Sequence, residues 1–119
     1  MKLSDVDIKH RLAAGGLEIE PSIPEANFGS LSIDLRLSGH FKVFRPTQTP
    51  FIDLGAVDGE FAMSDSAMEE VFVVDGGAFY LHPGELALGV TLERLVIPDD
   101  LVGWLDGRSS LARLGLGQK

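Results

Sequence analysis

The sequence predicts a mainly β fold built from short antiparallel strands, as three observations indicate. Apolar and polar residues alternate over 31–37 and again over 86–92, which is the period of a half-buried strand. Glycine and proline stand between the apolar runs, where they favour turns. No succession of strand, long helix and strand is present, so a parallel sheet is not expected. We therefore expect a single antiparallel domain over residues 1–119.

The first element expected is a helix that begins after Ser4 and ends at Gly15. A serine at this point can accept hydrogen bonds from the first turn, and a glycine commonly ends a helix. Ile8 and Leu12 are four residues apart, so they share the face that we expect to be buried. After the helix, residues 17–20 alternate like a short strand.

The clearest expected strand covers residues 31–37. We expect the chain to turn at Gly39 and to pair this strand with a second one over 41–44, as a hairpin. Asp34 and Arg36 lie on the polar face of the first strand, because they are two residues apart. An ion pair between these two side chains is the simplest explanation of their presence there.

The middle and the end of the chain are expected to supply further strands. Residues 101–106 form an apolar run around Trp104, which predicts a buried strand with the indole ring in the core. The segment 45–70 carries weaker patterns, because its glycines favour a loop. The other expected elements are a strand over 51–54, one helical turn over 64–70, a strand over 71–74, and a hairpin of 78–81 with 85–92 around the turn at 82–84.

A phosphate site is indicated by the residues that follow the run around the tryptophan. Residues 107–116 read Gly-Arg-Ser-Ser-Leu-Ala-Arg-Leu-Gly-Leu, which predicts a tight turn and then a short helix ended by a glycine. Either Ser109 or Ser110 is placed to cap this helix, and the N–H groups of its first turn favour an anion. Arg108 and Arg113 flank the same point, and arginine can bind phosphate oxygens through two parallel hydrogen bonds. By themselves the residue types favour an ordinary capped helix with two solvated arginines over a phosphate site, and they leave both interpretations open.

The string over 107–116 is similar to the phosphate-binding motif that dCTP deaminases and dUTPases share, and its Leu-Ala-Arg-Leu-Gly-Leu continuation resembles the deaminases more closely. Four further blocks, 3–8, 33–37, 79–85 and 101–106, also resemble the dCTP deaminase family. The resemblance covers residues 1–116. It implies the dUTPase-like antiparallel β-barrel or β-clip, with one short helix near the N-terminus and another after the Arg-Ser-Ser motif.

The same resemblance implies a reaction, an assembly and a set of site residues. In the family, dCTP is hydrolysed to dUTP and ammonia, with Mg²⁺ on the triphosphate and no zinc. The family also implies a homotrimer or another homo-oligomer, and it makes dTTP a candidate regulator. The implied site residues are Arg108, Ser109 and Ser110 at the phosphates, Leu111 and Ala112 lining the site through their backbone, and Ser109 with Arg113 reaching toward the base and the attacking water.

The general-base glutamate of the family has no counterpart in residues 1–119. In the family it belongs to a later part that also completes the sheet. We therefore expect an N-terminal part that lacks the C-terminal strands and does not deaminate dCTP by itself. Asp106 is the carboxylate nearest to the motif in sequence, and its place before a glycine indicates a turn residue. A zinc-deaminase mechanism is excluded, because the chain has no His-x-Glu with a Pro-Cys-x-x-Cys partner.

Composition narrows the class of partner. The chain carries 18 acidic and 10 basic residues, a net charge of −8, which argues against a nucleic-acid or anionic membrane surface. It has no cysteine, so it has no disulfide, and the absence of a signal-peptide pattern or a long apolar run predicts a cytoplasmic location. Two alternatives to a dCTP deaminase stay open. One is a dUTPase-type diphosphatase, which attacks the α-phosphate, and the other is a non-catalytic module that binds nucleotide or self-associates.

Overall fold

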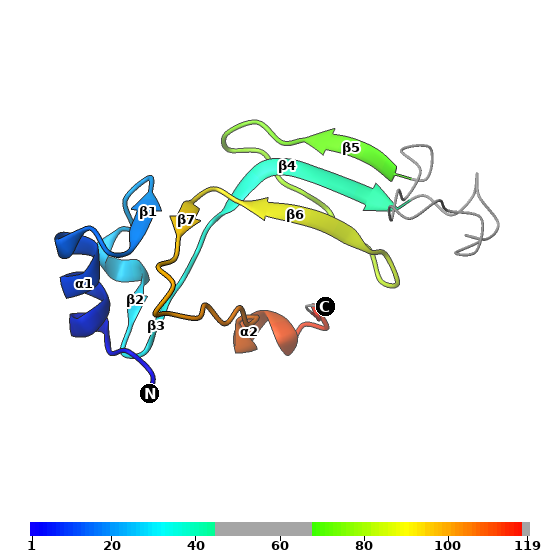
Figure 1. Ribbon diagram of the computed structural model, residues 1–119. Helices are drawn as coiled ribbons and strands as arrows, with labels where there is room; N and C mark the ends of the chain where they lie inside the picture. The colour runs from blue at the N-terminus through cyan, green and yellow to red at the C-terminus, as the bar shows by residue number, and fades with distance from the viewer. Residues whose placement is uncertain (45–67, 118–119) are drawn as a thin grey trace, which may run out of the picture.

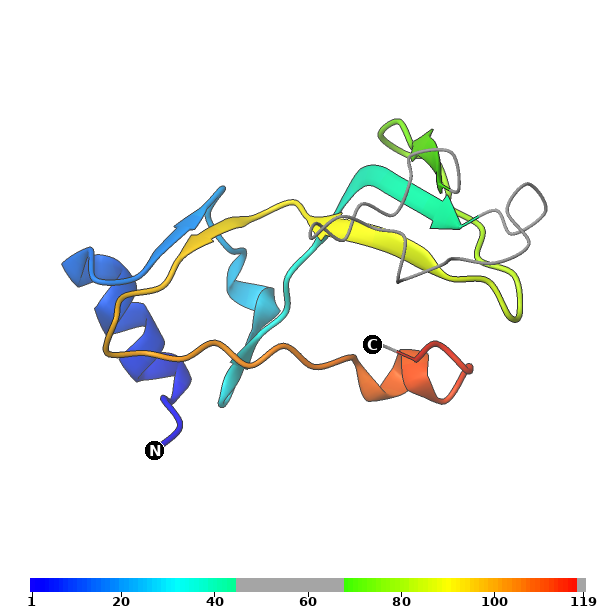
Figure 2. The same cartoon turned by 45° about the vertical axis from the view of Figure 1, so that its right-hand side comes forward.

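The computed structural model describes residues 1–44 and 68–117, and its elements form two groups (Figure 1). A short helix stands apart at the end of an extended segment, residues 97–108, in both views (Figures 1 and 2). Among the described residues no helix is long and apolar enough to span a membrane. The first group contains α1 (Asp5–Ala14), β1 (Glu18–Glu20), the 3-10 helix η1 (Glu25–Asn27), β2 (Phe28–Gly29), β3 (Ser32–Ile33) and β7 (Arg94–Val96); the second contains β4 (Leu37–Phe44), β5 (Met68–Phe72) and β6 (Ala87–Thr91); the separate helix is α2 (Ser109–Ala112).

Helix α1 forms where the sequence predicts it. The Ser4 hydroxyl accepts a hydrogen bond from the Asp7 backbone N–H at 3.2 Å, and the Asp7 carboxylate accepts one from the Ser4 backbone N–H at 3.1 Å. This reciprocal capping satisfies two N–H groups that a helix end otherwise leaves free. The hydrogen bonds from Ser4 also lower the pKa of Asp7. Gly15 ends the helix with a positive φ of 76°, and Ile8 on the predicted face is buried.

Two short ladders hold the first group together. The expected strand after α1 is confirmed as β1, and it pairs antiparallel with β7, so that Ile19 lies opposite Leu95. Strands β2 and β3 form a tight pair in which Phe28 lies opposite Ile33. The β1–β7 ladder joins segments that lie far apart in the sequence, and it brings the chain back beside α1 before the extended segment begins (Figure 1).

The second group is one antiparallel sheet in the order β5–β4–β6. Strand β4 continues through Gly39, with an irregular register against β6 between Leu37 and Phe41, so the hairpin expected at this glycine is wrong. The glycine serves a close approach of two backbones instead: a Cβ atom there would lie 2.2 Å from the carbonyl oxygen of Val73, whose N–H donates to the Gly39 carbonyl at 2.7 Å. Phe41 of β4 stacks on Phe79 with ring centroids 4.1 Å apart.

The single strand expected over 31–37 is also wrong, because the chain is divided there between β3 and β4. The connecting residues pair with two separate segments instead of one neighbouring strand. Asp34 N–H donates to the Asn27 carbonyl at 2.8 Å, and the Arg36 carbonyl accepts from Leu92 N–H at 2.8 Å. A ladder needs a continuous neighbour, and the polar alternation in the sequence does not reveal that the neighbour changes.

Other expected elements are shorter than predicted or displaced. The expected hairpin of 78–81 with 85–92 is present only in part. Its second strand is β6, but residues 78–81 form no strand. The turn between them is present, because Glu85 N–H donates to the His82 carbonyl at 3.1 Å. The strand expected over 71–74 lies earlier, as β5, so residues 68–70 are extended and not helical. The strand expected over 51–54 and the remainder of the expected helical turn lie outside the described residues.

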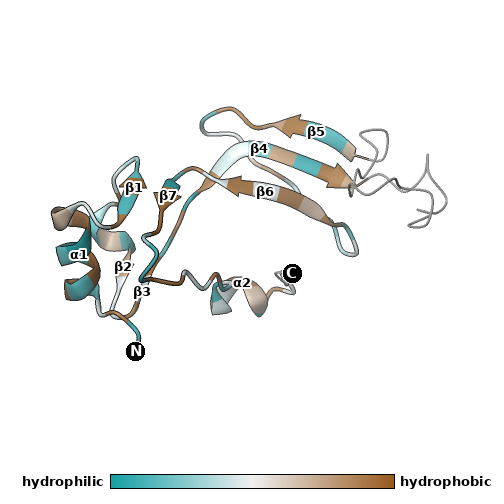
Figure 3. Ribbon diagram, in the orientation of Figure 1, coloured by the Kyte–Doolittle hydropathy of each residue, from teal (hydrophilic) through white to brown (hydrophobic). Residues whose placement is uncertain are grey.

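The strand expected over 101–106 is absent, and Trp104 is 90% exposed instead of buried. The run is apolar, as predicted, and Figure 3 shows it as a hydrophobic stretch between β7 and α2. A strand requires a backbone neighbour to pair with, and among the described residues this run has none. An apolar run therefore identifies a segment suited to burial without supplying the surface that covers it.

Few apolar side chains are buried among the described residues. Those that are buried are Ile8, Leu17 and Val43. The alternating side chains Leu86, Leu88, Val90 and Leu92, on and beside β6, are all about half exposed.

Candidate functional site

The predicted phosphate motif lies on α2 and on the residue before it. Arg108 is the N-cap residue, with extended backbone angles of φ −70° and ψ 131°, and it makes no side-chain capping hydrogen bond. Its carbonyl accepts from Leu111 N–H at 3.1 Å and from Ala112 N–H at 3.0 Å. The expectation that Ser109 or Ser110 caps the helix is therefore wrong, because both serines already lie inside its first turn.

The end of the helical segment matches the prediction. Gly115 has a positive φ of 88°, where a residue without a Cβ atom is favoured. Leu116 N–H donates to the Leu111 carbonyl at 3.1 Å, which folds the chain back after the glycine. The motif is thus one compact turn whose shape depends on local hydrogen bonds.

Several polar groups of this turn have no partner among the described residues. These are the hydroxyl groups of Ser109 and Ser110, their backbone N–H groups, and the guanidinium of Arg113. Every residue of the turn is exposed. Two hydroxyls, two N–H groups and two arginines within six residues form a donor-rich and positively charged segment on a chain whose net charge is −8. Such a segment is suited to an anion with several oxygens.

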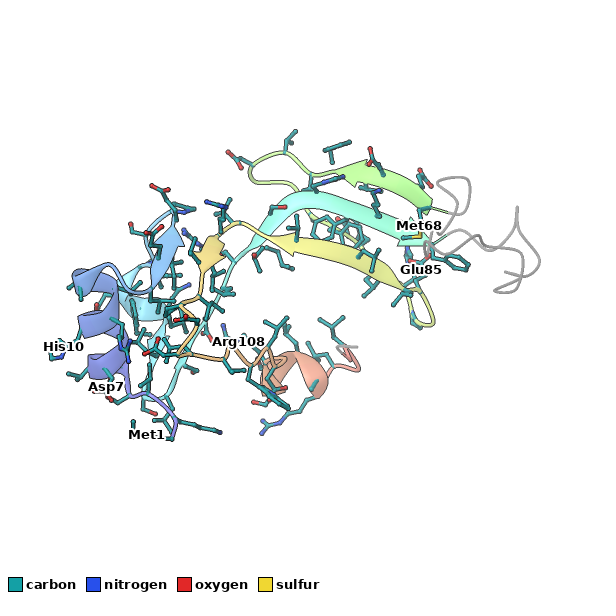
Figure 4. All side chains as sticks on the ribbon, in the orientation of Figure 1. Met1, Asp7, His10, Met68, Glu85 and Arg108 are labelled. Atoms are coloured by element: carbon teal, nitrogen blue, oxygen red, sulfur yellow. The ribbon has the colours of Figure 1, made fainter. Side chains whose placement is uncertain are left out.

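Arg108 has a partner that the sequence analysis missed. Its Nη1 atom lies 3.3 Å from Oδ2 of Asp34, between β3 and β4, so the expected ion pair of Asp34 with Arg36 is wrong. The side chains of Arg108 and Asp34 are 66% and 42% exposed. Figure 4 labels Arg108 where the extended segment meets α2. No pattern in the sequence links residues 74 positions apart, so this pair could not be found from spacing.

Arg36 is paired with Glu93, a residue that the sequence analysis did not single out. Glu93 is 2% exposed, and its carboxylate accepts from Arg36 Nε at 2.6 Å and from Arg36 N–H at 2.9 Å. Burial by itself raises the pKa of Glu93, but the hydrogen bonds from Arg36 outweigh burial and leave that pKa below its ordinary value. An acidic residue directly after the alternating apolar run was the available signal.

The other polar residues near the motif have local roles. Asp106 accepts a hydrogen bond from the Gly107 backbone N–H at 2.9 Å, in agreement with its expected role as a turn residue. His82 N–H donates to the Glu85 carboxylate at 3.2 Å in the turn before β6. An open pocket of about 250 Å³ lies on the sheet and away from the motif, and its lining residues are Val43, Val71, Ala78, Phe79, Tyr80, His82 and Glu85.

Comparison with known proteins covers nearly the whole chain. The sequence model of a family described as dCTP deaminase-like matches residues 2–119. A dCTP deaminase of Colwellia psychrerythraea is 50% identical over 118 residues, which are 98% of this chain and 60% of that protein. A dCTP deaminase of Shewanella oneidensis is 51% identical over 118 residues, which are 98% of this chain and 61% of that protein. The chain thus spans about 60% of the length of the curated relatives that it matches.

Proposed function

Because the chain belongs to the dCTP deaminase-like family, we propose that it supplies the phosphate-binding part of an enzyme that converts dCTP to dUTP and ammonia. The observation that carries this proposal is the α2 turn, where Arg108, Ser109, Ser110 and Arg113 present cationic and hydroxyl groups in an exposed segment. In this assignment the backbone around Leu111 and Ala112 completes the phosphate site.

The reaction needs more than phosphate binding. A water oxygen forms a bond to C4 of the cytosine ring, and the C4–N bond breaks, so that the amino group leaves as ammonia and the ring gains a carbonyl oxygen. A general base has to take a proton from the attacking water, and an acid has to supply one to the leaving nitrogen. Ser109 and Arg113 orient the water and the base in this proposal. Residues 1–119 contain no counterpart of the family's general-base glutamate, so we expect these residues by themselves to bind nucleotide but not to deaminate it.

Magnesium enters this proposal as a companion of the triphosphate. Among residues 1–44 and 68–117, no three His, Asp or Glu side chains are grouped so that they could hold a metal ion. Mg²⁺ commonly keeps several waters and binds through substrate phosphates with few protein ligands, which fits a site built from arginine and serine donors. When bound, Mg²⁺ would neutralise part of the triphosphate charge.

We further propose that the functional protein is a homo-oligomer, most simply the trimer that the family implies. Many large apolar side chains of the described residues are exposed, among them Trp104 and the four alternating residues from Leu86 to Leu92, and exposed apolar surface of this kind is typical of an interaction site. The apolar side chains along β6 and the segment 97–106 are the surfaces that association would cover. Light scattering on the protein should give a mass above that of one chain, and a monomer at micromolar concentration would contradict the proposal.

The activity is best tested in a chimera in which residues 1–119 replace the matching residues of the Colwellia psychrerythraea dCTP deaminase. With dCTP and Mg²⁺ the chimera should release ammonia, and dTTP should compete because it carries the same deoxyribose and triphosphate. Release of pyrophosphate from dUTP would instead support a diphosphatase. If neither ammonia nor pyrophosphate is formed, the result would support a non-catalytic module.

Arg113 provides the sharpest variant of that test. In the chimera, Arg113→Lys should lower ammonia release far more than Arg94→Lys, which makes the same substitution on an exposed residue of β7. Lysine offers a point charge where arginine offers a planar pair of donors, so it cannot reproduce the geometry. Equal turnover in both variants would remove Arg113 from the site.

A further inference from the structure

We propose that Asp34 is an internal competitor of the nucleotide phosphates: its carboxylate holds Arg108 in the free chain and has to release it when phosphate binds. This inference rests on the proposed function of the α2 turn and adds a control to it. Its basis is the contact between Arg108 Nη1 and Asp34 Oδ2 at 3.3 Å. The affinity of the site is then set by an exchange of one anion for another at the same guanidinium.

Asp34 presents its carboxylate from an anchored position. Its N–H donates to the Asn27 carbonyl at 2.8 Å, and its carbonyl accepts from Asn27 Nδ2 at 2.9 Å. Both backbone groups of Asp34 are therefore fixed to η1. Because the backbone is fixed, only a rotation of the side chain can move the carboxylate away from Arg108, so its charge stays near a ligand that binds there.

Arg108 is held less firmly. The segment 97–108 that leads to it has an ion pair at each end, because Asp100 accepts from Arg11 Nη1 at 2.8 Å near its start and Asp34 holds Arg108 at its end. The Arg108 contact joins one nitrogen to one oxygen, so it is not the bidentate arrangement that gives arginine–carboxylate pairs their strength. Since two thirds of the arginine side chain is exposed, solvent screens the pair and it contributes little stability.

A phosphate chain can therefore displace the carboxylate at low cost, but it does not remove it. A triphosphate offers more oxygens and more negative charge than a single carboxylate, so it should win Arg108. The displaced Asp34 carboxylate then remains beside the bound phosphates as a like charge, which opposes binding. Both effects have the same sign, so Asp34 should weaken anion binding at the site.

The test is a titration of the full chain with sodium tripolyphosphate by calorimetry at low ionic strength. Asp34→Asn keeps the shape of the side chain and removes its charge, and it should tighten binding by about three- to tenfold. The gain should shrink in high salt, which screens exposed charges. Asp100→Asn is the matched control, because it breaks the ion pair at the other end of the same segment without touching Arg108, and it should leave the affinity unchanged. Asp34→Ser should reproduce the gain if the amide of the first variant disturbs the fold.

Arg108→Ala separates this inference from the proposed function. It should weaken tripolyphosphate binding, and in its presence Asp34→Asn should tighten binding less than it does in the unchanged chain, because only the like-charge repulsion is left to remove. If Arg108→Ala binds tripolyphosphate as tightly as the unchanged chain, the proposed function of the turn is wrong. If Arg108→Ala weakens binding but neither Asp34 variant tightens it, the turn binds phosphate and the competitor role of Asp34 is wrong. If Asp34→Asn weakens tripolyphosphate binding, and does so only when Mg²⁺ is present, the competitor role is also wrong, because Asp34 would then help to bind the metal.

Discussion

The buried pair of Glu93 with Arg36 should stabilise the fold more than any exposed ion pair of the chain. Glu93 follows β6 and Arg36 precedes β4, so the pair lies where the two groups of elements meet (Figure 1). The Glu93 side chain is fully buried and accepts two hydrogen bonds from Arg36, at 2.6 Å and 2.9 Å. The Glu93 carboxylate and the Arg36 donors therefore satisfy each other's hydrogen bonds.

The two partners should not be equivalent when each is removed. Glu93→Ala leaves the Arg36 N–H without an acceptor, but the guanidinium is 38% exposed and water can solvate it, so the expected cost is about 2–4 kcal/mol. Arg36→Met leaves a carboxylate that is fully buried, for which the cost of an unpaired charge is about 3–5 kcal/mol. Arg36→Met should thus destabilise the chain at least as much as Glu93→Ala.

Urea unfolding followed by circular dichroism measures both free energies. Glu25→Gln is the control, because it breaks the Lys9–Glu25 pair, whose acidic side chain is 80% exposed, and it should cost about 0–1 kcal/mol. If Glu93→Ala shifts the unfolding midpoint no more than Glu25→Gln does, the buried pair is not a stabilising contact. If it costs clearly more than Arg36→Met, the argument from the buried carboxylate is wrong.

Three further predictions concern pH, backbone packing and the exposed tryptophan. The pKa of Glu93 is lower in the folded chain than its ordinary value of about 4.5, so its stabilising contribution is complete above that value and is lost as pH falls through the folded pKa; Glu93→Gln should flatten the dependence of the urea midpoint on acid pH. Gly39→Ala should cost about 1–3 kcal/mol in thermal unfolding, because its Cβ atom would meet the Val73 carbonyl at 2.2 Å, whereas Gly16→Ala meets nothing within 4 Å and should be tolerated. Trp104→Ser should change the stability of the dissociated chain by less than about 0.5 kcal/mol, in keeping with its 90% exposure, and a larger loss would show that the ring is buried.

Features that depend on neighbours along the chain could be predicted from the amino-acid sequence. The capping of α1 by Ser4, its end at Gly15 and the turn at Gly115 were all predicted, because each needs contacts between residues only a few positions apart. The antiparallel β class followed from the two-residue period and the turn residues. The family was recognised from continuous strings, of which 107–116 is the most specific.

Which distant segments meet could not be predicted from the sequence and is seen only in the folded chain. The fold paired β1 with β7, divided the run 31–37 between two ladders, and gave Asp34 to Arg108 and Arg36 to Glu93 instead of to each other. It also left Trp104 exposed, although the run around it is apolar enough for a core. The spacing of apolar residues indicates whether a segment is suited to burial. The partner that covers it or pairs with it is made of residues far away in the sequence. The ion pair of Arg108 with Asp34 therefore depends on the fold and could not be predicted from the spacing of residues in the sequence.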